Sequence, residues 1–470
     1  MLNDLYNRWC GESILSITKL PASGSPREYY RITGTSRTAI GAINMDREEN
    51  EAFIAFSRHF HSLGLAVPEI YLIDLDQNAY LQEDLGDLTL FDYVFQTRCN
   101  GDFPPALTEV YKGVLSELQK FQIEGAKDLD YSVCYPRASF DRQSMQWDLS
   151  YFKYYFLKLA GIPFNEQRLE NDYNTLIEYL LAQDTNYFLY RDFQSKNVML
   201  REGKPYFIDY QGGRKGALQY DVASMLYDSK ADIPPEVREE LLEHYIAGLA
   251  AYPEVDATKF RESYFAYVLI RIMQAMGAYG FRGFYEKKTH FLQSIPYALN
   301  DLKWILAHVD FSIEIPTLLQ VYEELLNAPK LKRFRDKEGR KSTLTVHINS
   351  FSYKHGIPED PDGHGGGYVF DCRVMSNPHR VERLKALNGK DKPVIEYLEQ
   401  QGDVNEFLSS TFSLVDMSVD KYEQRNFTHL RVSYGCTGGQ HRSVYCAERL
   451  AEHLRESQNV QVTLWHRELD

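Results

Sequence analysis

Hydrophobic positions in the first 90 residues follow the pattern of short strands around one helix. The stretches REYYRITG (27–34) and RTAIGAIN (37–44) alternate as strands do, and 69–86 has the pattern of two more short strands. Between them, ENEAFIAFSRHFHSLG (49–64) repeats apolar residues at helical spacing and ends at Gly64. The residues on that helical face are Phe53, Phe56, Phe60 and Leu63.

From about residue 105 to about residue 325 the pattern is mostly helical. Apolar residues recur at helical spacing in 106–122, 169–183 and 234–252. One stretch interrupts them, NYFLYRDFQSKNVMLREGKPYFIDYQGG (186–213), which has strand and turn signals. Functional residues concentrate on such irregular segments held by a regular scaffold, so we expect the site there.

From Leu344 onward strands and helices alternate, which predicts an α/β domain. Strands are expected at 344–353, 367–375, 429–435 and 460–466, and helices at 393–400, 407–422 and 443–457. Before this region, NAPKLKRFRDKEGRKS (327–342) is basic and lacks apolar periodicity, which predicts a solvated linker. A contact site for nucleic acid or an acidic partner is the alternative for this run.

Composition adds bounds to this picture. A chain of 470 residues with 44% hydrophobic content predicts two or three domains. Its net charge of −14 opposes non-specific binding to nucleic acid or acidic membranes. The start lacks a basic segment followed by an apolar run, and no stretch of about 18 apolar residues exists, so neither a signal peptide nor a membrane span is expected. The six cysteines include no C-x-x-C pair, which favours reduced thiols in the cytoplasm.

The interrupting segment carries the residues for phosphoryl transfer. Asp192 is followed five positions later by Asn197, and Asp209 follows a strand-like KPYFI. Transfer from ATP needs a carboxylate that orients or deprotonates the acceptor hydroxyl, and oxygen ligands for Mg²⁺. Asp192 fits the first role, and a hairpin could bring Asn197 and Asp209 onto one metal site. Downstream, Asp221 in QYDVASMLYD is interpreted as a helix N-cap or loop anchor.

These motifs, YRDFQSKN, FIDYQ and YDVASMLYD, resemble the aminoglycoside phosphotransferase and choline kinase family over about residues 5 to 325. The resemblance is nearest to the branch that phosphorylates the anomeric hydroxyl of N-acetylmuramate or N-acetylglucosamine. It implies an ATP- and Mg²⁺-dependent kinase in which Asp192 is the catalytic base and Asn197 and Asp209 bind Mg²⁺. AYLQEDLGD resembles the inter-lobe hinge. The nucleotide contacts implied by the resemblance are Ser25, Glu83 and Leu85.

The chain departs from the family pattern at several positions. Tyr190 and Gln194 stand where the family often has histidine, and the third strand ends in Asn44 where a phosphate-binding lysine is usual. The glycine-rich loop is reduced to Gly24 in ASGSPREYYRI. The anomeric-sugar branch also tends to lack the lysine, so its absence agrees with that branch. A pseudokinase scaffold carrying an adapter for RNA or protein is the alternative.

The segment RVSYGCTGGQHRSVYCAERL (431–450) has the pattern of a strand, a glycine-rich turn and an amphipathic helix, which is an arrangement that holds anions. Cys436 and Arg442 also have the spacing of a cysteine phosphatase loop, which would need a general acid that no feature selects among Asp360, Asp362 and Asp371. A Walker A loop is excluded because its lysine is missing. Histidines at irregular spacing make a metal site the weaker interpretation.

Motifs that run in order over 343–470, namely SFSYKHGIP, VFDCRVMSNPH, NGKDKPVIEYL and SYGCTGGQHRSVYCAERLAEHL, resemble the C-terminal domain of the RapZ RNase adapter family. The resemblance implies a domain that binds glucosamine-6-phosphate and RNA. It places Cys436 as a small packed residue and Asp371 and Arg373 either at the ligand or in a strand-end ion pair. The phosphosugar-binding residues implied are Thr437, Gly438, Gly439, His441, Arg442, Ser443, Asp371, Arg373 and His379.

RNA binding is disfavoured, because residues 343–470 hold 14 Lys and Arg against 18 Asp and Glu, which leaves −4. We therefore predict an α+β two-lobed protein-kinase-like fold followed by a smaller α/β domain. The kinase-like domain is expected at 1–326, with an N-lobe to about 90 and a helical C-lobe from about 91. The basic linker would occupy 327–342, and the sugar-phosphate-binding domain, whose ligand could act as an effector, 343–470.

Overall fold

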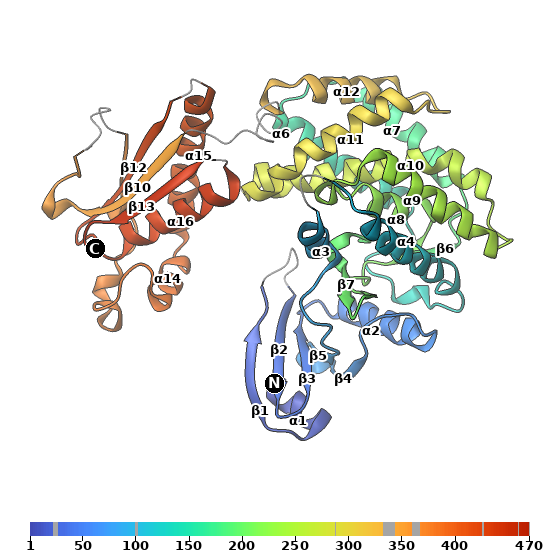
Figure 1. Ribbon diagram of the computed structural model, residues 1–470, viewed down its shortest axis with the longest axis horizontal. Coiled ribbons are helices and arrows are strands. Elements are labelled where there is room, and N and C mark those ends of the chain that lie inside the picture. The colour runs from blue at the N-terminus through green and yellow to red at the C-terminus, as the bar shows by residue number, and fades with distance from the viewer. Residues whose placement is uncertain are drawn as a thin grey trace. The chain divides into compact units, whose positions relative to one another are not determined.

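The computed structural model describes residues 1–21, 27–98, 102–286, 288–331, 344–359, 367–424, 427–458 and 460–469. The chain divides into two compact units. The first comprises Met1–Phe281 with Tyr297–Leu326, and the second comprises Arg282–Pro296 with Asn327–Asp470. Figure 1 shows both with their elements labelled. Most of the basic run 327–342 lies outside the described residues, so its role as a linker stays a prediction.

The N-lobe of the first unit is a five-stranded antiparallel sheet in the order β1-β2-β3-β5-β4 (Figure 1). Helix α2 begins after Asp46, whose side chain accepts the Glu49 N–H and caps the first turn. The elements are α1 (Leu2–Cys10), β1 (Ile14–Lys19), β2 (Glu28–Gly34), β3 (Thr38–Ile43), α2 (Arg47–Ser62), β4 (Ile70–Asp74) and β5 (Ala79–Gln82).

Helix α2 buries the apolar face that its sequence predicted, with one exception. Phe53, Phe56 and Phe60 are buried, whereas Leu63 follows the last helical residue and is 48% exposed. Phe60 packs edge to face on Phe188 and Tyr210 of the helical lobe. The aromatic face therefore ties the N-lobe to the segment that carries the predicted site.

Helix α1 was not among the elements that the sequence analysis predicted. Leu2, Leu5 and Tyr6 pack against Ile32 and Leu81 of the sheet. The Tyr6 hydroxyl also donates to the Arg37 carbonyl at 2.7 Å. This short helix covers a sheet face that would otherwise expose apolar side chains.

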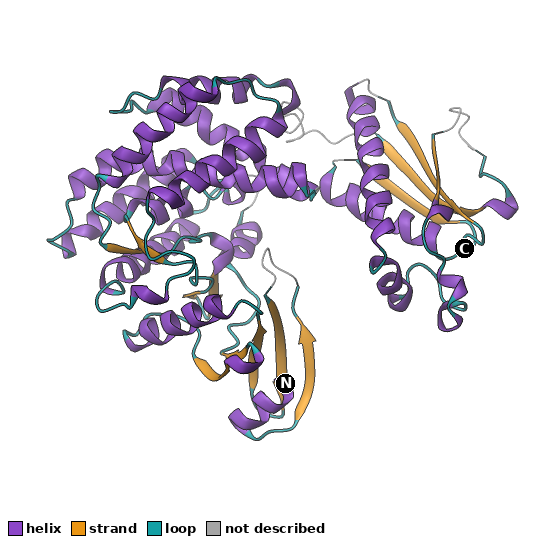
Figure 2. Ribbon diagram, turned by 180° about the vertical axis from the view of Figure 1, so that it is seen from behind, coloured by secondary structure: helices purple, strands orange, loops and turns teal. Residues whose placement is uncertain are grey.

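The C-lobe is helical, with two small two-stranded sheets, β6 with β9 and β7 with β8, as Figure 2 shows by colour. The 23-residue helix α10 is its longest described helix, and α5 and α8 pack against it. The elements are α3 (Leu90–Thr97), α4 (Pro105–Gln119), α5 (Arg142–Tyr151), α6 (Lys158–Ala160), α7 (Glu166–Leu181), β6 (Tyr187–Leu189), β7 (Val198–Arg201), β8 (Lys204–Phe207), β9 (Arg214–Gly216), α8 (Gln219–Leu226), α9 (Pro235–Gly248), α10 (Ala257–Tyr279), α11 (Ile295–His308) and α12 (Pro316–Asn327).

The second unit holds a four-stranded parallel sheet, drawn in orange in Figure 2. Its strand order is β11-β12-β10-β13. Helix α16 packs across β10, β12 and β13, and alternate strand residues such as Val346, Ile348 and Val432 face it in the core. The elements are β10 (Thr345–Ser352), β11 (Tyr368–Asp371), α14 (Lys392–Glu399), α15 (Gly402–Gln424), β12 (His429–Cys436), α16 (Arg442–Ser457) and β13 (Gln461–His466).

Candidate functional site

The three residues predicted for phosphoryl transfer meet at the β7–β8 hairpin. Val198 pairs with Phe207, so the chain just before β7 and just after β8 lies side by side. The Asn197 side-chain amide donates to the Asp192 carbonyl at 2.8 Å and to Asp209 Oδ2 at 3.1 Å. One amide thus connects the loop of Asp192 with the carboxylate of Asp209.

Asp209 has the surroundings of a cation ligand. Burial raises the pKa of Asp209, and the charge of Asp192 raises it further, while Gln211, Lys196 and Arg27 oppose the increase. Gln211 Nε2 donates to Asp209 Oδ1 at 2.8 Å. Two carboxylates repel each other in a buried place, and a bound cation relieves this cost.

The donor set fits Mg²⁺, which prefers oxygen ligands and retains water or phosphate oxygens in its shell. The Asn197 NH₂ group donates to Asp192 and Asp209. The Asn197 amide oxygen and the Asp209 carboxylate are therefore the protein atoms that could bind the metal. Among the described residues, no group of three or more His, Cys, Asp or Glu side chains could hold a metal ion. A metal at Asn197 and Asp209 would therefore need the phosphates of a nucleotide to complete its shell.

Two residues at the site have backbone conformations that L-amino acids rarely adopt. Arg191, next to Asp192, has φ 81°, and Asp209 has φ 69°. Each such conformation costs on the order of 1–3 kcal/mol, and it persists where surrounding contacts enforce it. The Arg191 guanidinium forms a bidentate pair with Asp148 at 2.6 and 2.8 Å, which is one of those contacts.

Asp221 supplies the other contact, because its carboxylate anchors the backbone before Asp192. Asp221 accepts the N–H groups of Tyr190 at 2.7 Å and Arg191 at 2.9 Å, and the Gln122 side chain at 3.2 Å. Burial raises the pKa of Asp221 to about 7, and these hydrogen bonds oppose the increase. The sequence analysis predicted that Asp221 is either a loop anchor or a helix N-cap. The hydrogen bonds confirm the loop anchor, and the N-cap of α8 is Leu218.

Tyr190 occupies the position where the family often has histidine, and its contacts account for the difference. It is fully buried, and its hydroxyl donates to the Ile208 carbonyl at 2.6 Å. Tyr190 thus joins the loop of Asp192 to the residue before Asp209. The signal that could have found it was its place in the same short motif as Asp192.

The predicted nucleotide contacts are only partly described. Leu85 is buried, and Glu83 Oε1 pairs with Arg201 Nη1 at 2.5 Å. The Glu83 N–H donates to the Glu69 carbonyl at 2.9 Å, so this hinge segment is tied to the chain before β4. Ser25 and Gly24 lie outside the described residues, and all these nucleotide contacts stay predictions.

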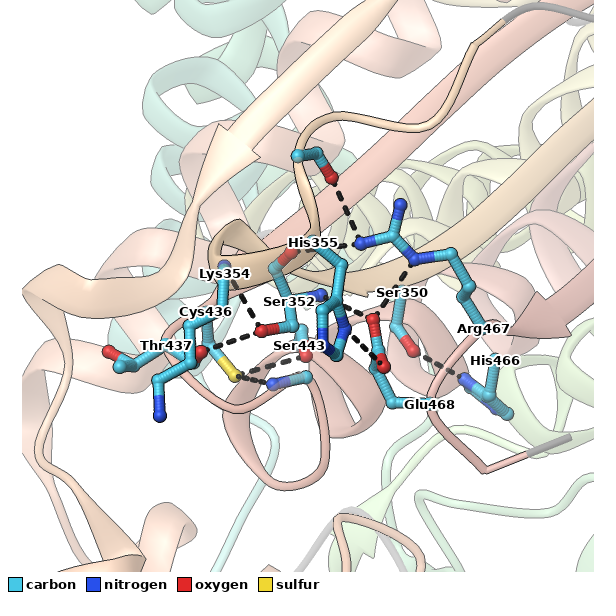
Figure 3. A network of polar contacts seen from close by, with 12 residues as sticks. Ser350, Ser352, Lys354, His355, Cys436, Thr437, Ser443, His466, Arg467 and Glu468 are labelled. Carbon is cyan, nitrogen blue, oxygen red and sulfur yellow. Dashed lines mark hydrogen bonds and ion pairs between the residues drawn. The ribbon is translucent and has the colours of Figure 1, made fainter.

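In the second unit, the loop between β12 and α16 wraps around Cys436 (Figure 3). Cys436 Sγ accepts the Gly439 N–H at 3.2 Å and lies 3.2 Å from the Ser443 hydroxyl. Gly439 has φ 70°, and a Cβ there would come within 2.3 Å of the Glu468 side chain, so only glycine fits this position. The sulfur is buried inside the loop, as expected of a packed cysteine.

Two of the residues predicted to hold phosphate also fasten the loop to residues 373–384. His441 Nε2 lies 3.0 Å from the Leu384 carbonyl, and Arg442 Nη1 donates to the Met375 carbonyl at 2.9 Å. Both side chains are buried, and burial lowers the pKa of His441. Arg442 Nε is buried without a hydrogen-bond partner in the described part of the chain.

The remaining predicted residues lie around this loop. Asp371 and Arg373 form a bidentate ion pair at 2.6 and 2.9 Å, which is the strand-end ion pair that the sequence analysis gave as one of two possibilities. His379 packs on the ring of His441. Thr437 and Gly438 are exposed. Glu468 lies beside the loop (Figure 3). Its carboxylate pairs with Arg467 at 3.0 Å, which compensates its negative charge, and lies 2.9 Å from His355 Nδ1.

Serine, histidine and carboxylate side chains follow one another in the second unit, but the two imidazole nitrogens are exchanged relative to a hydrolase triad, in which serine contacts Nε2 and the carboxylate contacts Nδ1. Ser350 Oγ lies 2.9 Å from His466 Nδ1, and His466 Nε2 lies 3.1 Å from Glu448 Oε1 (Figure 3 labels the first two). Ser350 and His466 are both buried in the second unit. These contacts give the buried Ser350 and His466 side chains hydrogen-bond partners, which is a structural role.

Comparison with protein families agrees with both halves of this description. Residues 16–257 match the phosphotransferase enzyme family, and residues 344–470 match the RapZ C-terminal domain. With the antiparallel N-lobe sheet, the helical C-lobe and the parallel sheet of the second unit, these matches confirm the predicted fold class. Within the described residues, no helix combines the length and the apolar character needed to cross a membrane.

Among curated proteins, an RNase adapter protein RapZ of Yersinia enterocolitica is 44% identical over 123 residues, which are 26% of this chain and 42% of that protein. A nucleotide-binding protein of Glaesserella parasuis is 37% identical over 169 residues, which are 36% of this chain and 55% of that protein. The chain thus spans about half the length of these relatives.

Among solved structures, choline kinase LicA from Streptococcus pneumoniae aligns with a TM-score of 0.40 and 15% identity, over 70% of this chain and 97% of that one. Choline kinase from Cryptosporidium parvum aligns with a TM-score of 0.44 and 13% identity, over 66% and 93% of the two chains.

Proposed function

The chain belongs to the phosphotransferase enzyme family, and from this premise we propose that it phosphorylates an amino sugar at the anomeric hydroxyl, using ATP and Mg²⁺. The acceptor would be N-acetylmuramate or N-acetylglucosamine. The observation that supports phosphoryl transfer is that Asn197 bridges the Asp192 loop and the Asp209 carboxylate at 2.8 and 3.1 Å. The choice of an amino sugar as acceptor rests on the resemblance of the sequence motifs to the anomeric-sugar branch. The proposed location is the cytoplasm, where ATP is available.

Each residue of the site has a defined task in this proposal. Asp192 would accept a hydrogen bond from the acceptor hydroxyl, orient it, and take its proton as the new bond forms. Asn197 and Asp209 would hold Mg²⁺, which neutralises charge on the phosphates. Asp221 and Asp148 would fix the backbone and side chain of Arg191, and so the position of Asp192.

A substrate screen tests the proposal. Amino sugars, choline and aminoglycosides would be incubated with labelled ATP and Mg²⁺, and the position of phosphate in any product would be read by NMR. Transfer to the anomeric oxygen of an N-acetylated amino sugar is the expected result. Phosphorylation of choline or an aminoglycoside alone would contradict the amino-sugar proposal, and an absence of MgATP binding would favour the pseudokinase scaffold.

For the C-terminal domain we propose binding of a sugar phosphate such as glucosamine-6-phosphate, which would regulate the kinase. The support is the match of residues 344–470 to the RapZ C-terminal domain, together with the exposed Thr437–Gly438 turn before α16. Glucosamine-6-phosphate that binds without altering kinase kinetics would contradict the regulatory part. The division into 1–326, the linker 327–342 and 343–470 remains part of this proposal, and RNA binding remains disfavoured.

A pair of substitutions tests the phosphate-binding loop. Arg442→Ala should weaken glucosamine-6-phosphate binding by about 1.5–3 kcal/mol, the value of a hydrogen bond to a charged group. Cys436→Ser should leave affinity nearly unchanged, because a hydroxyl can also accept the Gly439 N–H. Calorimetric titration measures both, and a melting curve controls for the lost Arg442–Met375 contact.

Equal loss of affinity in the two variants would contradict this assignment. Phosphatase activity that disappeared with Cys436→Ser would instead support the cysteine phosphatase alternative.

A further inference from the structure

Asn44 stands where the family usually has a phosphate-binding lysine, so the nucleotide phosphates would lack their usual positive charge. The residues around Asn44 show which other side chain could supply it. Asn44 follows directly after β3, and its side-chain amide donates to Glu49 Oε2 of α2 at 2.7 Å. The asparagine therefore keeps a bond to a helix carboxylate but contributes no charge. A kinase built this way needs a cation from another position.

Arg27 stands across the ladder from Asn44. Strands β2 and β3 are antiparallel with Glu28 opposite Ile43, so the next position on each strand brings residues 27 and 44 together. Arg27 Nη2 lies 3.3 Å from Glu49 Oε1, the other oxygen of the carboxylate that Asn44 holds. The same glutamate thus binds the asparagine and the arginine.

Arg27 is buried against helix α2, the helix that follows the third strand. Its side chain is only 1% exposed, and its guanidinium lies over the Phe53 ring at 5.5 Å from the centroid. A cation in such dry surroundings interacts more strongly with phosphate than one in water.

We propose that Arg27 binds the nucleotide phosphates in place of the missing lysine, with Glu49 orienting its guanidinium. The inference rests on the proposed ATP-dependent function. An arginine suits this task because its planar guanidinium can donate to two phosphate oxygens at once. The positive charge has in effect moved from the third strand to the facing position of the second.

Two variants of the full chain test the inference. Arg27→Gln removes the charge, and Arg27→Gln with Asn44→Lys returns a charge to the facing strand. Binding of MgATP and of adenosine, which lacks phosphates, is measured by calorimetry. Arg27→Gln should weaken MgATP by roughly 10- to 100-fold and leave adenosine nearly unchanged, and the double variant should recover most of the loss.

Arg47→Gln is the matched control, because Arg47 lies at the start of α2 and pairs with Glu51 on the surface. It should bind both ligands as the parent does. Equal weakening of MgATP and adenosine by Arg27→Gln would mean that Arg27 only clamps β2 to α2, and would overturn the inference. Unchanged MgATP binding, or failure of both Arg27 variants to fold, would overturn it as well.

The parent protein separates this inference from the kinase proposal. If the parent binds MgATP and Arg27→Gln binds it equally well, the kinase proposal stands and the role of Arg27 fails. If the parent binds no MgATP, both fail together.

Discussion

Asp192→Asn should lower kcat by roughly 10²- to 10⁴-fold, because the amide can no longer take the acceptor proton. The affinity for MgATP should change by no more than about twofold, since the proposed metal ligands are Asn197 and Asp209 and remain in place. Asn197 contacts the backbone carbonyl of Asp192 and not its carboxylate, so the substitution leaves that hydrogen bond intact. Transfer of labelled phosphate to the acceptor found in the screen measures kcat.

Asp310→Asn is the control for this substitution, because Asp310 is an exposed aspartate of the same unit outside the site. It should retain parental turnover. Near-parental turnover in Asp192→Asn would contradict the assignment of the catalytic base. A melting temperature equal to that of the parent would show that a loss of activity is chemical.

The sequence predicted those parts of the fold that depend on local pattern. Apolar spacing located α2, and the burial of Phe53, Phe56 and Phe60 confirms its inner face. Leu63 was wrongly included, because the helix ends at Ser62 and the following residue turns outward. Helix α1 was not predicted, although Leu2, Leu5 and Tyr6 have helical spacing, because a helix of nine residues is marginal until it packs on the sheet.

The site was predictable in its residues but not in its supports. Asp192, Asn197 and Asp209 occur in short motifs whose spacing follows from one hairpin. The bond from Asp221 to the backbone of Arg191 spans 30 positions, and spacing along the chain cannot reveal it. Likewise, Arg27 faces Asn44 only because of strand register, and Arg442 binds the Met375 carbonyl 67 positions away.

Asp221→Ala is expected to have the largest effect on stability. Asp221 is fully buried, and its loss leaves the N–H groups of Tyr190 and Arg191 without an acceptor, while the Gln122 amide keeps only its bond to the Leu218 carbonyl. Each buried unsatisfied donor costs about 1–3 kcal/mol, so the free energy of unfolding of this unit should fall by about 3–5 kcal/mol. Calorimetric melting and hydrogen exchange in peptides that cover 190–197 measure the loss.

Asp172→Ala separates loop anchoring from the general cost of losing a buried aspartate. Asp172 is also buried, and its carboxylate accepts the Leu318 N–H at 2.8 Å in another part of the same lobe. It should lower stability by less, since fewer donors lose their acceptor, and it should leave both kcat and exchange at 190–197 unchanged. Asp221→Ala should reduce kcat even at temperatures where the unit is folded, because the Arg191 N–H then loses its acceptor and only side-chain contacts still oppose relaxation of its φ of 81°. Equal destabilisation by the two variants, or parental kcat in Asp221→Ala, would contradict the role of Asp221 as the anchor of this loop.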